Sequence, residues 1–176
     1  MSVEIDTAMV LAAGLGKRMR PLTDTMPKPM VPLAGRPLVD HTLDRLADSG
    51  IKRAVVNVHY KAEVLEAHLA ARQSANRGPE VSISDERGLL LETGGGVVKA
   101  LPLIGGRPFL ICNSDTTWVE TGVCNLKRLI AGWDAARMDS LMLLAEKDRS
   151  LGYSGGGDFR LGADGCLTRR GAGETA

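Results

Sequence analysis

Glycines and positively charged side chains follow a short apolar run near the start of the chain. The run Met9–Ala13 breaks at the turn Gly14-Leu15-Gly16. Cations come next along the chain: Lys17, Arg18, Arg20 and Lys28. Glycine leaves backbone N–H groups open to a close-lying anion, and lysine and arginine add positive charge. The segment therefore predicts a loop that binds a polyanion such as a nucleoside triphosphate.

The spacing of this loop differs from two common phosphate-binding motifs. It lacks the Gly-Lys-Ser/Thr ending of a Walker loop, and it does not open directly into a helix as a dinucleotide-binding turn does. Prolines exclude a regular helix over residues 19–28. We expect an extended loop that wraps a ligand and brings Arg18 and Lys28 onto it, with a plain tight turn as the alternative. From the residues alone, Lys17 and Arg20 are interpreted as solvated surface charges.

A carboxylate follows a second apolar run. The segment Asn113-Ser114-Asp115 comes directly after the predicted strand Pro108–Asn113. Magnesium favours one or two carboxylates, with phosphate oxygens and waters as its other ligands. Asp115 is therefore a candidate Mg²⁺ ligand, and a cap on the following turn is the alternative role. Parallel strands bring their carboxyl ends to one edge of a sheet, so Asp115 is expected to share that edge with the glycine loop.

Two further glycine-rich segments could approach a ligand. In Leu91–Gly96 the glycines would let the backbone contact a flat ligand face, and Thr93 is a candidate helix cap. A flexible loop is the alternative there. The glycines of residues 155–157 could present Asp158 to a sugar hydroxyl, although an ordinary turn explains that pattern equally well.

The elements that must position these residues alternate between strand and helix. Short apolar or β-branched runs predict strands at Thr7–Ala13, Arg53–Val58, Val81–Ser84, Pro108–Asn113 and Ser140–Ala145. Helical spacing predicts helices at Pro37–Gly50, Lys61–Arg72, Thr93–Leu101 and Leu126–Trp133. The chain is expected to form an α/β fold, with a mostly parallel sheet and helices on both faces. A β-hairpin over Asp158–Leu161 and Cys166–Arg170 is expected near the C-terminus.

Composition excludes several other functions. The 176 residues suit a single domain, and a net charge of +1 argues against non-specific binding of nucleic acid. No apolar run approaches the ~20 residues that a membrane span requires. Cys112, Cys124 and Cys166 are too widely spaced for a metal motif and are interpreted as reduced thiols of a cytoplasmic protein. The three histidines are assigned structural roles: His41, His59 and His68.

The chain resembles the sugar-1-phosphate nucleotidyltransferases over residues 7–170. Three segments carry the resemblance: the glycine loop with the residues that flank it, the LETGGG segment Leu91–Gly96, and the PFLICN segment Pro108–Asn113. The LETGGG spelling and the segment Gly155–Phe159 look most like the N-acetylmuramate-1-phosphate uridylyltransferases of peptidoglycan recycling. The resemblance implies a Rossmann-like nucleotide-diphospho-sugar transferase fold over residues 1–176. Family members use a second metal-binding aspartate in a late segment that this chain does not contain. The sequence ends soon after the predicted hairpin, in Gly171-Ala172-Gly173, without a closing helix, so we expect the chain to lack its C-terminal segment.

The resemblance also implies roles for individual residues. Arg18 and Lys28 would be catalytic, Asn113 and Asp158 would contact the sugar, and Asp115 would hold Mg²⁺. Residues implied in nucleotide binding are Leu11, Ala12, Ala13, Gly14, Gly16, Lys17, Arg18, Lys28, Glu86 and Gly94. Among these, Glu86 stands near the place of a base-reading side chain, and Gly94 would meet the base through its backbone.

The implied reaction transfers a uridylyl group from UTP to an N-acetylated sugar 1-phosphate and releases pyrophosphate. The implied partners are UTP and the sugar phosphate, with no nucleic acid or membrane, in a monomer or small homo-oligomer. Two alternatives stay open. One is mannose-1-phosphate guanylyltransferase or another sugar-1-phosphate nucleotidyltransferase, and the other is a non-catalytic nucleotide-sensing subunit.

Overall fold

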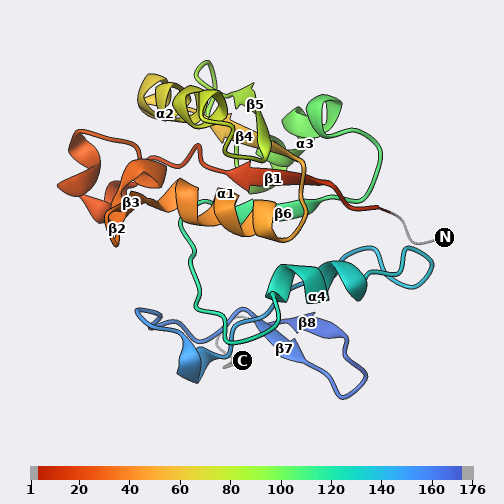
Figure 1. Cartoon of the computed structure of the whole chain (residues 1–176). Helices are drawn as coiled ribbons and strands as arrows, with labels where there is room; N and C mark the ends of the chain where they lie inside the picture. Colours follow the sequence, from red (N-terminus) through yellow and green to blue (C-terminus); the bar gives the residue numbers. More distant parts are fainter. Residues whose placement is uncertain (1–3, 172–176) are drawn as a thin grey trace. The chain divides into compact units, whose positions relative to one another are not determined.

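A four-stranded parallel sheet forms the centre of the larger part of the protein. In a computed structural model, which describes residues 4–171, its strand order is β5-β4-β1-β6. The strands are β1 (Thr7–Leu11), β4 (Arg53–Val58), β5 (Glu80–Asp85) and β6 (Leu110–Asn113). Every pairing in this sheet is parallel, so all four carboxyl ends lie along one edge, on the left in Figure 1. The predicted parallel α/β fold is confirmed.

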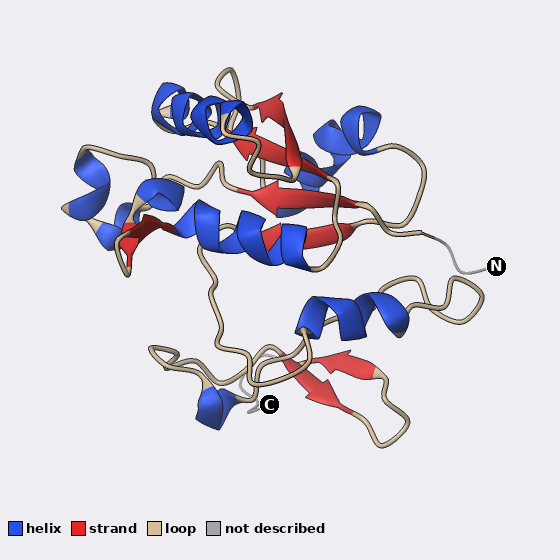
Figure 2. Ribbon diagram, in the orientation of Figure 1, coloured by secondary structure: helices blue, strands red, loops and turns tan. Residues whose placement is uncertain are grey.

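Helices cover both faces of this sheet (Figure 2). Alternate residues of a strand point to opposite faces. Accordingly, Val10 and Val56 pack in the core beneath α1 and α2, whereas Met9 and Val55 pack against α3. The helices are α1 (Leu38–Asp48), α2 (Ala62–Ser74), α3 (Thr93–Ile104) and α4 (Asn125–Ala131).

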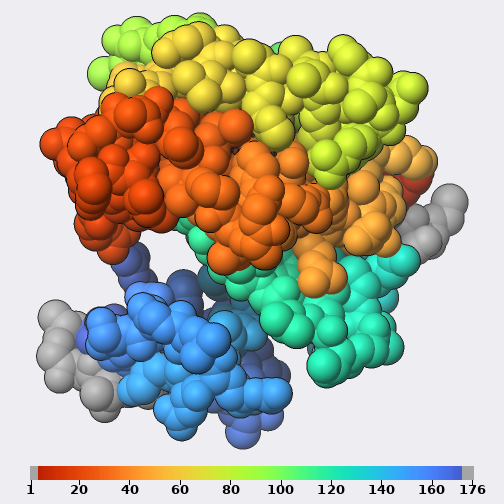
Figure 3. Space-filling model, turned by 60° about the vertical axis from the view of Figure 1, so that its left-hand side comes forward, coloured from red at the N-terminus to blue at the C-terminus, as the bar shows by residue number. Residues whose placement is uncertain are grey.

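Short turns fill the segment between β1 and α1. Three single 3₁₀ turns, η1 (Lys17–Met19), η2 (Leu22–Asp24) and η3 (Lys28–Met30), precede the small antiparallel pair β2 (Pro32–Leu33) and β3 (Arg36–Pro37). The prolines exclude a regular α-helix here as predicted, but the segment is coiled into 3₁₀ turns instead of extended. It lies at the surface beside α1 and α2, in red to orange in Figure 3.

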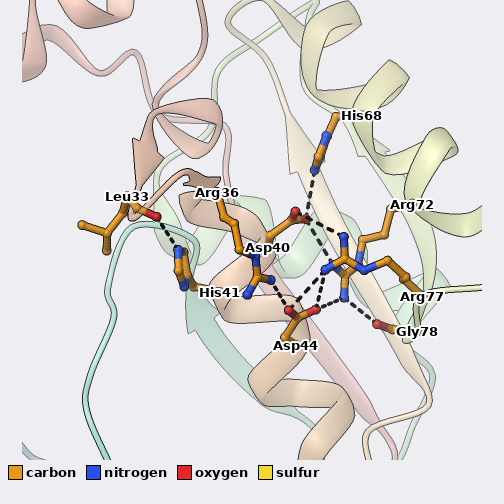
Figure 4. Close-up of polar contacts among 9 residues, drawn as sticks. All are labelled: Leu33, Arg36, Asp40, His41, Asp44, His68, Arg72, Arg77 and Gly78. Atoms are coloured by element: carbon orange, nitrogen blue, oxygen red, sulfur yellow. Dashed lines mark hydrogen bonds and ion pairs between the residues drawn. The ribbon is translucent and has the colours of Figure 1, made fainter. Parts of the chain in front are cut away.

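An ion-pair network joins α1 to α2 (Figure 4). The buried guanidinium of Arg72 donates hydrogen bonds to Asp40 at 3.1 Å, to Asp44 and to the Gly78 carbonyl at 2.8 Å. His68 also contacts the Asp40 carboxylate, at 2.9 Å. Because Asp40 is buried, these partners replace the water that its charge has lost.

Residues 139–171 belong to a second compact unit. It contains the turn η4 (Lys147–Arg149) and the antiparallel hairpin of β7 (Phe159–Leu161) and β8 (Leu167–Arg169). The predicted hairpin is confirmed, whereas the predicted strand Ser140–Ala145 is wrong, because residues 141–146 have no regular secondary structure. The expectation that residues 1–176 form a single domain stays a prediction.

Candidate functional site

A cavity opens at the carboxyl edge of the parallel sheet. It has a volume of about 350 Å³. Its walls come from the ends of β1, β4 and β6 and from the segment before α3. The lining residues are Leu11, Ala12, Ala13, Gly14, Lys28, Pro29, Asn57, Leu90, Leu91, Glu92, Thr93, Asn113, Ser114 and Asp115. The shared edge that the sequence analysis expected for the glycine loop and Asp115 is therefore present.

A second cavity of about 430 Å³ adjoins the first and shares Gly14, Lys28, Leu90 and Asp115 with it. The glycine loop supplies the remaining lining, through Leu15, Gly16, Lys17, Arg18 and Met19. Lysine and arginine side chains thus lie beside glycine backbone at one hollow. The combination can bind a polyanion, with N–H donors at close range and positive charge around them.

Thr23 holds the glycine loop in place. Gly16 has φ +63°, a backbone conformation that residues other than glycine rarely adopt. The Thr23 hydroxyl donates a hydrogen bond of 2.9 Å to the Gly16 carbonyl, and Tyr60 donates one of 3.0 Å to the Thr23 carbonyl. Thr23 lies so close that a Cβ on Gly16 would be 2.8 Å from its Cγ2. Sequence reasoning missed Thr23, since a threonine in a polar loop gives no distinctive pattern.

Lys28 and Asp115 form an ion pair where the two cavities meet. Lys28 begins η3, and Asp115 follows the end of β6. Their side chains are 25% and 30% exposed, so both remain accessible to a ligand. The alternative role for Asp115, a cap on its own turn, is not what its side chain does here.

Asp115 is suited to a divalent cation only together with a ligand's oxygens. Among residues 4–171, no three histidine, cysteine, aspartate or glutamate side chains gather as a metal site. A single accessible carboxylate beside an anion-binding loop matches the way Mg²⁺ binds nucleotides, with phosphate oxygens and waters as its remaining ligands. The residues present therefore fit a metal that arrives with its nucleotide.

Glu86 does not lie where a base-reading side chain was expected. Its side chain is fully buried and lines neither cavity. Asn57 donates a hydrogen bond of 2.8 Å to Glu86 Oε1, and the Leu91 N–H donates one of 3.1 Å to Oε2. The structure thus gives Glu86 a supporting position behind the cavity wall. Asn57 was missed, although one amide inside the apolar strand RAVVNV is itself a signal.

Other predicted residues lie beside the cavities or apart from them. Gly94 follows the lining residue Thr93 in the first turn of α3, and Glu92, not Thr93, is the N-cap residue of that helix. Arg20 lines neither cavity and pairs with Asp24 at 3.4 Å, in line with a surface role. Asp158 belongs to the second unit, and its contact with a sugar stays a prediction.

The histidines and cysteines take no part in the cavities. Each histidine ring contacts a protein oxygen: His41 the Leu33 carbonyl, His59 the Glu86 carbonyl and His68 the Asp40 carboxylate. The three cysteines are free thiols. Burial raises the pKa of Cys112 to about 11, which leaves that thiol protonated near neutral pH.

No helix within residues 4–171 combines the length and the apolar character that a bilayer span needs.

Comparison with known proteins identifies the family. Residues 7–151 match the nucleotidyl transferase family, and the chain belongs to it. The chain is 48% identical over all its 176 residues to N-acetylmuramate alpha-1-phosphate uridylyltransferase of Caulobacter vibrioides, and spans 73% of that protein. It is 45% identical over 108 residues to the same enzyme of Neisseria meningitidis, which covers 61% of this chain and 46% of that relative.

The fold has a counterpart among solved structures. A UDP-glucose pyrophosphorylase complexed with UDP-glucose superimposes with a TM-score of 0.64 at 20% identity. The match covers 73% of this chain and 53% of the other. At this identity the likeness shows the fold alone. The family and the uridylyltransferase relatives together identify the chain as a nucleotidyltransferase.

Proposed function

We propose that the protein transfers a uridylyl group from UTP to N-acetylmuramate 1-phosphate, giving the UDP-sugar and pyrophosphate, in peptidoglycan recycling. The single observation that carries the proposal is the pair of adjoining cavities, where the glycine loop, Lys28 and Asp115 come together. The choice of uracil and of this sugar is supported by the two uridylyltransferase relatives.

The reaction depends on the alignment of the two substrates and does not depend on proton transfer. A phosphate oxygen of the sugar 1-phosphate attacks the α-phosphorus of UTP, the new P–O bond forms, and the bond to the pyrophosphate oxygen breaks. The attacking phosphate is already anionic near neutral pH, so no general base is required. What the protein must supply is an in-line arrangement and neutralisation of the charge on the reacting phosphoryl group.

The residues of the cavities can be assigned parts in this reaction. Leu11–Gly14 and the segment before Gly94 would receive the nucleoside, while Gly16, Lys17 and Arg18 would bind the triphosphate. Lys28 would neutralise charge at the α-phosphate. Mg²⁺ held by Asp115 and the nucleotide's oxygens would withdraw further charge from the phosphoryl group. Asn113, which lines the first cavity, would contact the sugar.

A release assay for pyrophosphate tests this proposal directly. Purified protein is supplied with each of four nucleoside triphosphates against N-acetylmuramate, N-acetylglucosamine, glucose and mannose 1-phosphates. We expect the fastest release with UTP and N-acetylmuramate 1-phosphate. Preference for GTP with mannose 1-phosphate would replace this proposal with the guanylyltransferase alternative. Binding of UTP without release from any pair would indicate a nucleotide-sensing subunit instead.

A further inference from the structure

A series of three hydrogen bonds, two of them buried, links the two walls of the first cavity. The Ala12 N–H, just after β1, donates to Asn57 Oδ1 at 2.6 Å. Asn57 Nδ2 donates to Glu86 Oε1 at 2.8 Å, and the Leu91 N–H, just before α3, donates to Glu86 Oε2 at 3.1 Å. Ala12 and Leu91 both line the cavity, on segments far apart in the sequence. Two side chains therefore connect the two segments.

The groups at the two ends of this hydrogen-bond series fix which atoms donate and which accept. Both ends are backbone N–H groups, which only donate. Asn57 must therefore accept through Oδ1 and donate through Nδ2, and Glu86 must accept on both carboxylate oxygens. A glutamine at position 86 would offer one acceptor where two are needed. The need for two acceptors at a buried position explains a carboxylate that lines neither cavity.

Helix α3 rests directly on the same pair. A Cβ built on Gly96 would be 2.8 Å from Glu86 Oε1 and 3.0 Å from Asn57 Nδ2. Only glycine lets the first turns of α3 approach this closely. Because α3 begins at Thr93, which also lines the cavity, the position of Asn57 and Glu86 constrains where that wall stands.

We propose that Asn57 and Glu86 are positioning residues, which set the separation of the two segments that receive the nucleoside. Glu86 lines neither cavity and acts on the nucleoside half of the ligand through the backbone at Leu91 and through Asn57, whose own side chain lines the first cavity. The triphosphate half is left to the glycine loop. Glu86 thus governs base affinity without touching the base. This inference rests on the proposed function, because it takes the first cavity to be the nucleoside site.

Exchanging the amide of Asn57 and the carboxylate of Glu86 tests these hydrogen bonds. Asn57→Asp places two carboxylates face to face, and Glu86→Gln places an N–H donor against another donor. The double variant N57D/E86Q moves the carboxylate to position 57 and the amide to position 86. All the hydrogen bonds can then form again: the new carboxylate accepts from Ala12 and from the new amide, whose oxygen accepts from Leu91. Net charge in the double variant equals that of the wild type.

Isothermal titration with UTP and with inorganic tripolyphosphate separates positioning from general damage. Each single variant is expected to weaken UTP binding by at least about tenfold, because mispaired buried groups push the walls apart. Tripolyphosphate affinity should stay within about twofold of wild type, and the double variant should recover UTP binding. Gly96→Ala displaces Asn57 and Glu86 without changing their chemistry. It should also weaken UTP binding and leave tripolyphosphate binding unchanged. Urea denaturation establishes that each variant is folded.

Several results would overturn the inference. Folded single variants that bind UTP like the wild type would reject it, as would an equal loss of UTP and tripolyphosphate affinity. Failure of the double variant to recover would also reject it. If the single variants do not fold, normal UTP binding by Gly96→Ala is the rejecting result. A folded wild type that binds no UTP would overturn the proposed function itself, and this inference with it.

Discussion

The ammonium of Lys28 and the carboxylate of Asp115 pair across the point where the two cavities meet. The pair joins the turn η3 to the segment after β6, so it connects two loops at the carboxyl edge of the sheet. With its charge matched by Asp115, Lys28 presents less net positive charge to a phosphate. Binding of a nucleotide and a cation must therefore exchange this ion pair for contacts with the ligand.

Replacing Lys28 by methionine should abolish most turnover and leave the fold intact. Removal of one electrostatic contact to a reacting group commonly lowers the rate by about a hundredfold or more. A partly exposed ion pair contributes only about 0–1 kcal/mol to the free energy of unfolding. Pyrophosphate release and urea denaturation measure the two quantities. Arg20→Met removes an equal charge from a residue that lines neither cavity, and it should leave turnover unchanged. Normal release by Lys28→Met would reject the catalytic role.

Asp115→Asn should have opposite effects on binding and turnover. Without a divalent cation the Asp115 carboxylate repels the triphosphate and neutralises Lys28, so its removal should tighten UTP binding in excess chelator by about threefold to tenfold. With Mg²⁺ present the variant loses a metal ligand, and release of pyrophosphate should fall by about a hundredfold. Titration of UTP in excess chelator and in Mg²⁺ measures binding, and a pyrophosphate release assay with Mg²⁺ measures turnover. Equal UTP affinities under the two conditions in wild type and variant would contradict the metal role.

The fold was largely predictable because its central strands, β1 and β4, are buried on both faces. Arg53–Val58 reads as a β-branched run and is a strand over the same residues. Ser140–Ala145 is an apolar run without β-branched residues, and it forms no strand. A strand also needs a neighbour with free N–H and C=O groups, which the local sequence does not reveal. The site was predictable where residue type and strand end coincide, as at Asp115. The link from Asn57 to Glu86 depends on tertiary contacts and could not be foreseen.

Gly16→Ala should reduce both stability and activity, whereas Gly35→Ala should reduce stability alone. Both glycines have positive φ, +63° at Gly16 and +78° at Gly35, and a side chain in that conformation costs about 1–3 kcal/mol. Only at Gly16 would the new Cβ also meet neighbours, Thr23 at 2.8 Å and the Cβ of Lys28 at 3.3 Å. At Gly35 nothing lies within 4 Å. Thermal melts and pyrophosphate release measure the two effects, and equal turnover in the two variants would contradict this account of the loop.

Asp44, in the network between α1 and α2, should make the protein less stable in acid (Figure 4). Burial raises the pKa of the Asp44 carboxyl, but hydrogen bonds and positive charge from Arg72 and Arg36 outweigh burial and leave it below its ordinary value of 3.8. The unfolded chain therefore binds a proton at a higher pH than the folded protein does. Its contribution to stability is complete above about pH 5 and is lost as pH falls through the folded pKa.

Asp44→Asn should accordingly lower the free energy of unfolding near neutral pH and flatten its fall below about pH 4. Some slope will remain, because Asp6 and Glu120 also have lowered pKa values. Urea denaturation between about pH 2.5 and pH 7 gives both quantities. Asp48→Asn makes the same charge change on α1, at an exposed residue with no ion pair among residues 4–171, and should keep the wild-type slope. An unchanged slope in Asp44→Asn would show that the Arg72 and Arg36 contacts do not hold this carboxylate ionised in acid.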